Sequence, residues 1–314
     1  MDVITIGESM VLFTPKEEGP LRYVSEFKKT MGGAESNVAI ALARLGHSVG
    51  WVSKLGDDEF GLFIRNFIRG EGVDTSQVIF DDHLPTAVFF KEKRSQLDPN
   101  IYYYRKGSAF SSIQFEDLDT GYLSQAKFIH LTGITPALSH SSKETLLRVV
   151  EFAHSNEQTL VFDPNIRLKL WTSNEAKETL LEISKNCHIV MPGIDEGVLM
   201  TGETSPENIA KSLLNNKTKV VIVKLGEKGA YFATQEENAY VPAYRVDHIV
   251  DTAGAGDGFA AGVLSGLIRG WDYYQSVRFG NKIGSFALGV LGDMEGYPYW
   301  NQVSSENKKS QILR

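Results

Sequence analysis

The chain of 314 residues has an ordinary globular composition, with 42% hydrophobic and 23% charged residues, and is long enough to bury a large core. Its net charge of −7 argues against nucleic acid or an anionic membrane as the main partner. The single cysteine, Cys187, excludes a disulfide within the chain and a cysteine-rich metal site, and no apolar run approaches membrane-spanning length. We therefore expect a soluble, cytoplasmic protein.

The first part of the chain alternates short apolar runs with helical patterns. Paired glycines at 32 and 33 lead into an alanine-rich helix, whereas residues 10–30 contain glycine and proline that would break a helix. The predicted elements are a buried strand at 3–7, the helix that closes at Gly46, a strand at 49–55 and a helix ending at Arg69.

A segment of different texture follows. Two β-prone runs, 87–90 and 101–105, are joined by a polar turn that contains residues 98–100, which predicts a hairpin. Because no helix separates its strands, the hairpin is not a crossover in a parallel sheet, and we interpret it as a small antiparallel flap. On its second strand, Tyr103 and Arg105 share one face.

Strand and helix then alternate to the end of the core, which implies a parallel sheet with helices on both faces. The predicted strands are 127–132, 159–163, 188–192 and 219–224, with a hairpin around 229–247. The predicted helices are 140–155, 173–186, 206–215, 257–269 and 273–290. Ligands bind at the carboxyl ends of such strands, so the loops that follow them are expected to converge on one edge.

The most informative of these loops is the stretch Val250–Gly262, where small residues surround an aspartate at a predicted helix start. Glycines let the backbone approach a ligand closely, and the free N–H groups and the dipole of a helix N-terminus favour an anion, above all phosphate. Asp257 would lie at the lip of this site. It is either a base that takes the proton of an attacking hydroxyl or an ordinary N-cap, and the residues alone leave both open.

Four further features each have a functional and a structural interpretation. Arg167, in the turn after a strand, suits phosphate or carboxylate, or is a surface arginine. Arg105 with Tyr103 suits a polyhydroxylated acid, or is an exposed arginine stacked on aromatic rings. The turn at 224–229 could wrap a nucleotide or simply close a hairpin. Glu196 could be a helix-start carboxylate or could hold Mg²⁺ through water.

Two motifs together resemble the ribokinase-like, phosphofructokinase B-type family of carbohydrate kinases, over about residues 1–300. They are Gly32-Gly33-Ala34-x-x-Asn37-x-Ala39 and Asp251-Thr252-x-Gly254-Ala255-Gly256-Asp257. The resemblance implies one kinase domain over 1–314, with a three-layer α/β/α core of ribokinase-like α/β fold and a β-sheet lid from about 12–30 and 84–108. It also implies ATP and Mg²⁺ as cofactors, with Asp257 as catalytic base and Gly254, Ala255 and Gly256 as an anion hole.

Within the family, three motifs are similar to those of 2-keto-3-deoxygluconate kinases: Tyr103-Tyr104-Arg105, Asp163-Pro164-Asn165-x-Arg167 and Gly292-Asp293-x-Glu295-Gly296. The implied sugar contacts are Gly33, Asn37, Phe89, Tyr103, Arg105 and Arg167. The implied ATP contacts are Asn165, Lys224, Gly226, Gly229 and Asn281. The implied metal contacts are Glu196, through water to Mg²⁺, and Asp251, near a monovalent cation such as K⁺.

The expected reaction is the ATP-dependent phosphorylation of 2-keto-3-deoxygluconate to its 6-phosphate. The cationic residues Arg105 and Arg167 favour a sugar acid, while fructose or another ketose is the alternative, and a non-catalytic sugar or nucleotide sensor is a third. Two positions depart from the family pattern: Gly193 stands where asparagine is usual, and Phe89 where a lid tyrosine can occur. The exposed β-surface of the lid makes a homo-oligomer the expected assembly.

Overall fold

A sheet of nine strands runs through the molecule, and the computed structural model describes it within residues 1–92 and 100–304. The strand order is β13-β12-β11-β10-β9-β8-β1-β4-β5, parallel from β11 to β5, with β12 and β13 antiparallel at one edge. The strands are β1 (Val3–Ile6), β4 (Val49–Gly56), β5 (Val78–Asp81), β8 (Phe128–Thr132), β9 (Thr159–Asp163), β10 (Ile189–Val190), β11 (Val220–Lys224), β12 (Ala230–Ala233) and β13 (Asn238–Val241).

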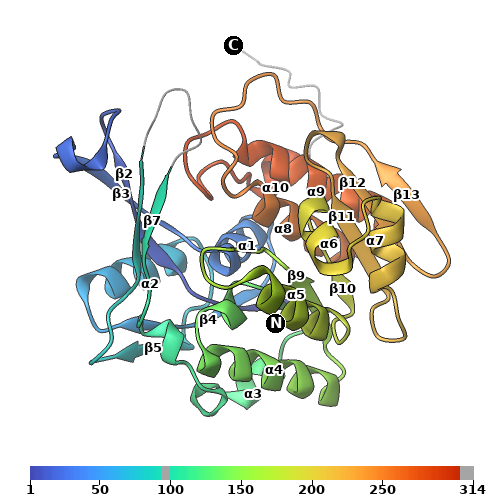
Figure 1. Cartoon of the computed structure of the whole chain (residues 1–314), viewed down its shortest axis with the longest axis horizontal. Helices are drawn as coiled ribbons and strands as arrows, with labels where there is room; N and C mark the ends of the chain where they lie inside the picture. The colour runs from blue at the N-terminus through green and yellow to red at the C-terminus, as the bar shows by residue number, and fades with distance from the viewer. Residues whose placement is uncertain (93–99, 305–314) are drawn as a thin grey trace.

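Helices cover both faces of this sheet, which gives the three layers expected (Figure 1). One hydrophobic cluster joins the sheet to α1 (Ala34–Arg44), α2 (Glu59–Gly70), α8 (Ala255–Ile268) and α9 (Tyr273–Ala287), and α10 (Trp300–Val303) packs nearby. A second cluster joins the other face to α3 (Thr120–Leu123), α4 (His140–Ser155), α5 (Ser173–Ser184), α6 (Ile194–Thr201) and α7 (Pro206–Leu213). The central strands are almost continuously apolar because both of their faces are buried.

Helices α8 and α9 pack closely through glycines. A Cβ atom on Gly262 would lie 2.7 Å from the Cα atom of Gly280, so the two backbones touch where a side chain would otherwise separate them. This contact explains the glycine at position 262, and it fixes the close spacing of α8 and α9.

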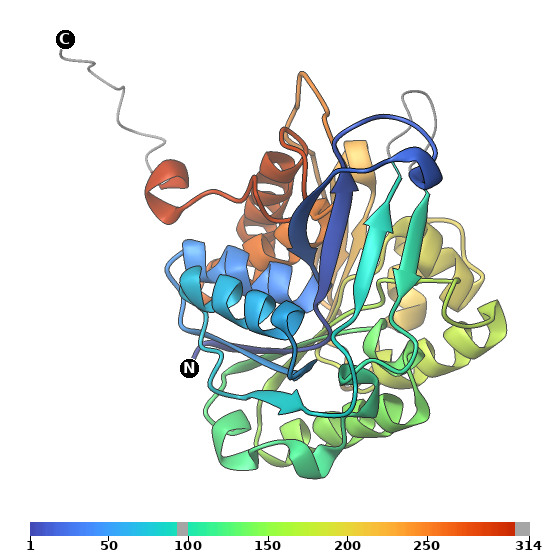
Figure 2. The same cartoon turned by 90° about the vertical axis from the view of Figure 1, so that its left-hand side faces the viewer.

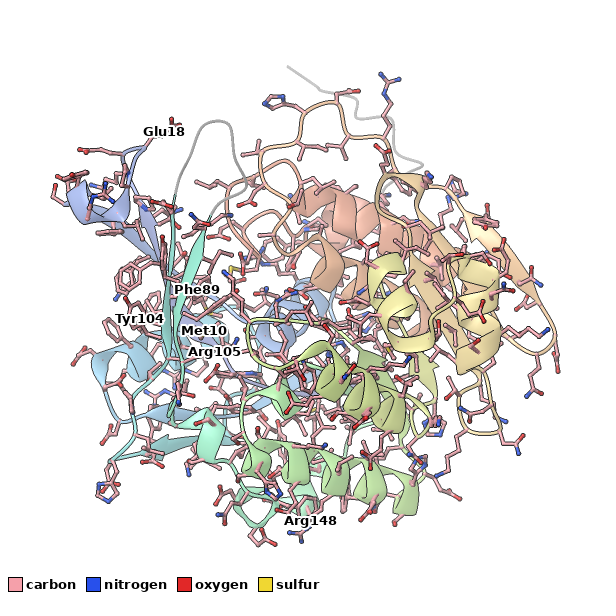
Figure 3. The ribbon with its side chains drawn as sticks, viewed as in Figure 1. Met10, Glu18, Phe89, Tyr104, Arg105 and Arg148 are labelled. Carbon is pink, nitrogen blue, oxygen red and sulfur yellow. The ribbon has the colours of Figure 1, made fainter. Side chains whose placement is uncertain are left out.

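A separate sheet of four strands, the lid, stands beside the core (Figure 2). Its order is β3-β2-β6-β7, from β2 (Met10–Pro15), β3 (Phe27–Gly32), β6 (Val88–Lys91) and β7 (Ile101–Tyr104). Met10, Phe89 and Arg105 face the core, whereas Tyr104 points away from it (Figure 3). The lid therefore has an inner face over the core and an outer face of aromatic rings, including Phe13 and Phe90, which stack 5.1 Å apart.

The structure corrects several predictions. The antiparallel pair of β6 and β7 confirms the predicted hairpin, but the hairpin is part of a mixed sheet: β6 also pairs in parallel with β2, and β2 pairs antiparallel with β3. Strand β5 and helix α3 were not predicted, and the hairpin expected at 229–247 covers only 230–241. The turn expected at 98–100 lies largely outside the described residues. In the part of the chain that the structure describes, no helix has the length and apolar character needed to cross a membrane.

Candidate active site

The N-terminus of α8 has the backbone geometry of an anion site. The helix begins at Ala255, two residues earlier than predicted, after Gly254 in the left-handed region at φ 74°. A Cβ at Gly254 would lie 1.7 Å from the carbonyl oxygen of Asp293, so only glycine fits. The first intrahelical bond runs from the Gly258 N–H to the Gly254 oxygen (2.8 Å). The N–H groups of Gly256 and Asp257 therefore precede the helical ladder, at the positive end of the dipole.

Asp257 is not an N-cap, so that alternative is wrong. The N-cap position is Gly254, and the Asp257 carboxylate instead accepts a hydrogen bond from Nδ2 of Asn37 (2.8 Å). Burial raises the pKa of Asp257 to about 7; the nearby carboxylates of Asp163 and Asp293 also raise it, while Asn37 and Arg167 lower it. The Asp257 side chain is only half-buried, so a bound substrate could contact it, and its pKa suits a general base near neutral pH.

A lysine lies close to the same helix end. Nζ of Lys224, at the end of β11, is 2.6 Å from Oδ2 of Asp163, at the end of β9. A Cβ at Gly256 would lie 4.0 Å from this Nζ, which places the ammonium beside the first turn of α8. Burial alone would lower the pKa of Lys224, but Asp163, Glu196 and Asp257 raise it above its ordinary value. The lysine is therefore charged and adds to the attraction for an anion.

Two residues of the predicted site, Asn165 and Glu196, form hydrogen bonds within or to the loop after β9. Asn165 is buried at φ 38°, and its N–H donates to Asp163 (3.2 Å). Glu196 accepts from the N–H of Ile166 (2.8 Å) and from that of Gly193 (2.6 Å). Each carboxylate oxygen keeps a second lone pair for a water. Among the described residues no three metal-ligating side chains gather, and this sparse oxygen set fits Mg²⁺, which keeps several waters and takes ligands from substrate phosphates.

A cavity of about 600 Å³ adjoins the N-terminus of α8. Its lining includes four of the five predicted ATP residues, Lys224, Gly226, Gly229 and Asn281, together with Ala255 and Gly256. Asn165 is not part of this lining. The volume falls in the range of small-molecule sites, and the wall continues into the anion site.

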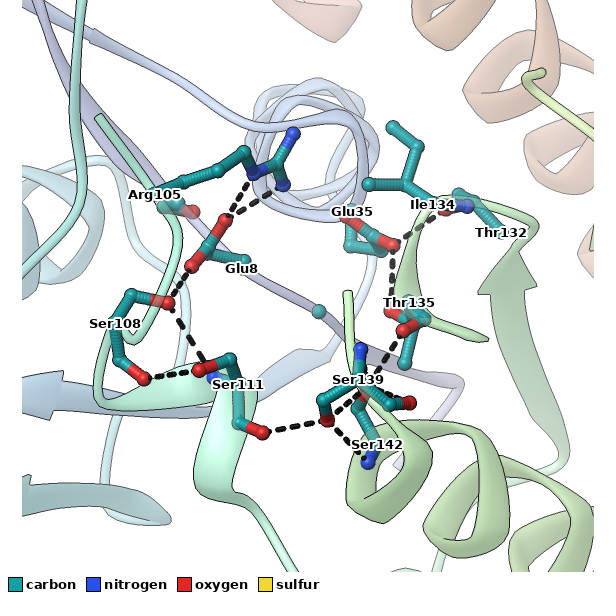
Figure 4. A network of polar contacts seen from close by, with 12 residues as sticks. Glu8, Glu35, Arg105, Ser108, Ser111, Thr132, Ile134, Thr135, Ser139 and Ser142 are labelled. Carbon is teal, nitrogen blue, oxygen red and sulfur yellow. Dashed lines mark hydrogen bonds and ion pairs between the residues drawn. The ribbon is translucent and has the colours of Figure 1, made fainter. Parts of the chain in front are cut away.

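Arg105 is not the exposed arginine of the second alternative, and its contact with a sugar acid stays a prediction. It is neither exposed nor a free cation, because Nε and Nη2 donate to Oε2 of Glu8 at 2.7 and 2.6 Å (Figure 4). The Ser108 hydroxyl donates to the other oxygen of Glu8. The side chains of Arg105 and Glu8 are 7% and 2% exposed, so a buried ion pair shapes this wall of the site. The remaining nitrogen of Arg105 points away from Glu8 in Figure 4.

Further predicted sugar contacts surround this pair. Tyr103 stacks with Phe89 at 5.7 Å, and its ring lies 5.6 Å from the Arg105 guanidinium. Gly33 precedes α1, and a Cβ there would lie 2.7 Å from the carbonyl oxygen of Glu8. Arg167 is exposed, but its charge acts on Asp257, which places it toward the base.

Sequence reasoning missed three residues of this site. Glu8 directly follows the first strand, Lys169 lies two residues beyond Arg167, and Asp293 belongs to a motif that was noticed without a role. Lys169 donates to the Ile101 carbonyl of the lid (3.1 Å) and lies 5.9 Å from the Tyr103 ring. Burial raises the pKa of Asp293 to about 6. The signal for Glu8 was a charged residue shortly after a strand, and the signal for Asp293 was a charged residue inside a glycine motif, whereas Lys169 had no local signal beyond its nearness to Arg167.

Asp251 is bound by a lysine of the lid. Its Oδ2 is 2.5 Å from Nζ of Lys91, and its Oδ1 accepts from the N–H of Ala253 (3.2 Å). The monovalent cation expected beside Asp251 stays a prediction, and it would have to share this carboxylate with an ammonium.

Comparison with known proteins extends over almost the whole chain. A model described as "pfkB family carbohydrate kinase" matches residues 1–299. The 2-dehydro-3-deoxygluconokinase of Bacillus subtilis is 42% identical over 307 residues, which cover 97% of this chain and 95% of that protein. The solved structure of a PfkB protein from Polaromonas sp. JS666 has a TM-score of 0.89 at 36% identity, covering 97% and 99%.

A further solved structure, an Escherichia coli protein described as a ribokinase II, contains ATP and Mg²⁺. It has a TM-score of 0.89 at 26% identity and covers 96% of this chain and 97% of its own. These matches agree with the large sheet and the separate lid. The chain therefore belongs to the pfkB family of carbohydrate kinases, and it is an ATP-dependent kinase with a ribokinase-like fold.

Proposed function

We propose that the chain phosphorylates 2-keto-3-deoxygluconate. This compound is also called 2-dehydro-3-deoxygluconate, and the Bacillus subtilis relative is named as its kinase. The observation that carries the mechanism is Asp257, a half-buried carboxylate with a pKa of about 7 beside the N-terminus of α8. Its Oδ2 is oriented by Asn37, so the carboxylate is held in place to receive a proton.

In the proposed reaction, the primary hydroxyl of the sugar acid forms a bond to the γ-phosphorus while the bond to the β,γ-bridging oxygen breaks. Asp257 accepts the hydroxyl proton, and ADP carries away the electron pair of the broken bond. The N–H groups of Gly256 and Asp257, with the ammonium of Lys224, stabilise the charge on the transferring group. Mg²⁺, when bound, neutralises phosphate charge, and Glu196 would hold it through water.

The charged side chains near the lid are the reason for proposing a substrate that carries a carboxylate. Arg105 is balanced by Glu8, so it adds little net charge. Arg167 and Lys169 donate to backbone carbonyls and to no carboxylate among the described residues. The positive charges of Arg167 and Lys169 favour a substrate carboxylate over a neutral ketose.

A coupled ATP-consumption assay tests this assignment with 2-keto-3-deoxygluconate, its galactose-derived epimer, gluconate, fructose and ribose. We expect the highest kcat/KM with one of the 2-keto-3-deoxy acids. Arg167→Ala and Lys169→Ala should each raise the KM for the acid about 10-fold or more, as loss of a charged hydrogen bond does, and leave turnover of fructose unchanged. A preference for fructose would instead support the ketose alternative.

We also propose that the outer face of the lid joins two copies of the chain. Its rings include Tyr104, 66% exposed, and Tyr102, 45% exposed, beside the Phe13–Phe90 stack. Apolar rings in such a cluster are better covered than left in water. Light scattering after size exclusion tests this, and a monomer at micromolar concentration would contradict it.

A further inference from the structure

One partly buried ion pair joins the lid to the loop that leads into α8. Lys91 is the last residue of β6, and its Nζ lies 2.5 Å from Oδ2 of Asp251, with side-chain exposures of 16% and 11%. Pairs this well shielded from water interact more strongly than surface pairs, and they are costly to break. Nothing in the phosphoryl transfer described above uses Lys91.

The Asp251 carboxylate shapes the turn immediately before the anion site. Its Oδ1 accepts the Ala253 N–H, which fixes the chain just ahead of Gly254. The core holds the same turn through two further bonds: the Val250 N–H donates to Leu288 (2.8 Å), and the Tyr297 hydroxyl donates to the Gly254 oxygen (2.6 Å). Lys91 reaches this turn from the lid. The charge of Lys91 therefore acts on residues 251–254, and the position of this turn determines where the first N–H groups of α8 point.

The ammonium also balances a cluster of acids. A narrow groove between the lid and the core is lined by Lys91, Asp251 and Glu295, among others. Burial raises the pKa of Asp293, the charge of Lys91 lowers it, and Glu295 and Asp251 raise it, so all three acids act on one region. Without Lys91, like charges would face one another across the turn, and their repulsion would favour a displaced loop.

We propose that Lys91 is a positioning residue, which holds Asp251 and the 251–254 turn so that the anion hole is complete only when the lid lies over the core. Lys91 touches no reacting atom and acts through Asp251. The lid would thus contribute to phosphoryl transfer as well as to sugar binding, and ATP bound without the lid in place would meet an incomplete hole.

The main test is Lys91→Met, which keeps the length of the side chain and removes its charge. Kinetics are measured with whichever sugar gives the highest turnover, so the result does not depend on the sugar assignment. We expect kcat to fall about 10- to 100-fold, somewhat less than for loss of an oxyanion-hole donor itself, with both KM values within about threefold. Lys29→Met is the matched control, because that lid lysine lies over the Phe63 ring (4.1 Å), and it should behave like the parent.

Two further measurements separate positioning from general stability. Lys91→Ala should regain turnover with added methylammonium and not with tetramethylammonium at the same ionic strength, because only the smaller ion fits the place of the lost Nζ. The double variant of Lys91→Met with Asp251→Asn should be no slower than the slower single variant, since both changes break one interaction. An unchanged kcat in Lys91→Met, no rescue by methylammonium, or effects that multiply in the double variant would each overturn the proposal.

Discussion

Replacing Arg105 by methionine removes one partner of a buried ion pair and leaves the other in place. The Glu8 side chain is 2% exposed, and two of its hydrogen bonds come from Arg105. Removing one partner of such a pair costs about 3–5 kcal/mol, because a charge is left buried without compensation. With about 2.1 cal/mol/K of unfolding entropy per residue, a 314-residue chain should then melt about 5–8 °C lower.

Differential scanning calorimetry of four proteins measures this: the parent, Arg105→Met, Glu8→Leu and the double variant. We expect each single variant to melt lower, and the double variant to recover most of the loss, since apolar residues of similar volume can replace a buried pair without destabilisation. If Arg105→Met melts within about 1 °C of the parent, or if the two losses simply add, the pair does not hold this wall together.

The same reasoning bears on enzyme assays. Arg105→Ala would disturb the wall formed with Glu8 and Ser108, so it should reduce turnover of acidic and neutral sugars alike. A variant of this residue therefore does not distinguish a sugar-acid kinase from a ketose kinase, whereas variants of the exposed Arg167 do.

Further predictions concern the reaction centre. Asp257→Asn should lower kcat about 10²- to 10⁴-fold, the usual contribution of a general base, with little change in sugar KM; near-normal turnover would refute the role of Asp257. Because this carboxyl must be ionised to accept a proton and burial raises its pKa to about 7, kcat/KM should rise with pH up to about 7 and level off above it, and a flat profile from pH 5 to 8 would contradict this. Gly256→Ala should fold normally but lose activity, because its Cβ has space beside Lys224 and would enter the anion site. Gly254→Ala should instead lower the melting temperature, since its Cβ would lie 1.7 Å from a carbonyl oxygen. Equal melting temperatures for the two variants would count against this geometry.

Local patterns predicted the segments that carry the phosphate site. The glycines ahead of α1 and α8, the alternation of strand and helix, and the position of Asp257 all depend on short stretches of sequence, and the helices appeared within a few residues of their predicted ends. The unusual backbone at Gly254 follows from the same local signal, since glycine is the residue that adopts it readily.

What the sequence did not reveal depends on distant contacts. The pairing of β2 with β6 joins segments more than seventy residues apart, and no local pattern distinguishes it from a simple hairpin. Likewise Glu8 could not be recognised as the partner of Arg105, because the two are 97 positions apart. Asp293 looks like a loop residue in the sequence, and its raised pKa arises only because the folded chain buries it.

The glycine contact between α8 and α9 fixes the position of the nucleotide cavity relative to the reaction centre. The first helix supplies the N–H groups of the anion site, and the second supplies Asn281 to the wall of the cavity. Because their backbones meet without intervening side chains at Gly262 and Gly280, the helices cannot slide or rotate against each other without steric overlap. The helix pair thus fixes the distance between the anion site and the Asn281 wall of the cavity, and lid residues on the sugar side can be exchanged without moving these two helices relative to each other.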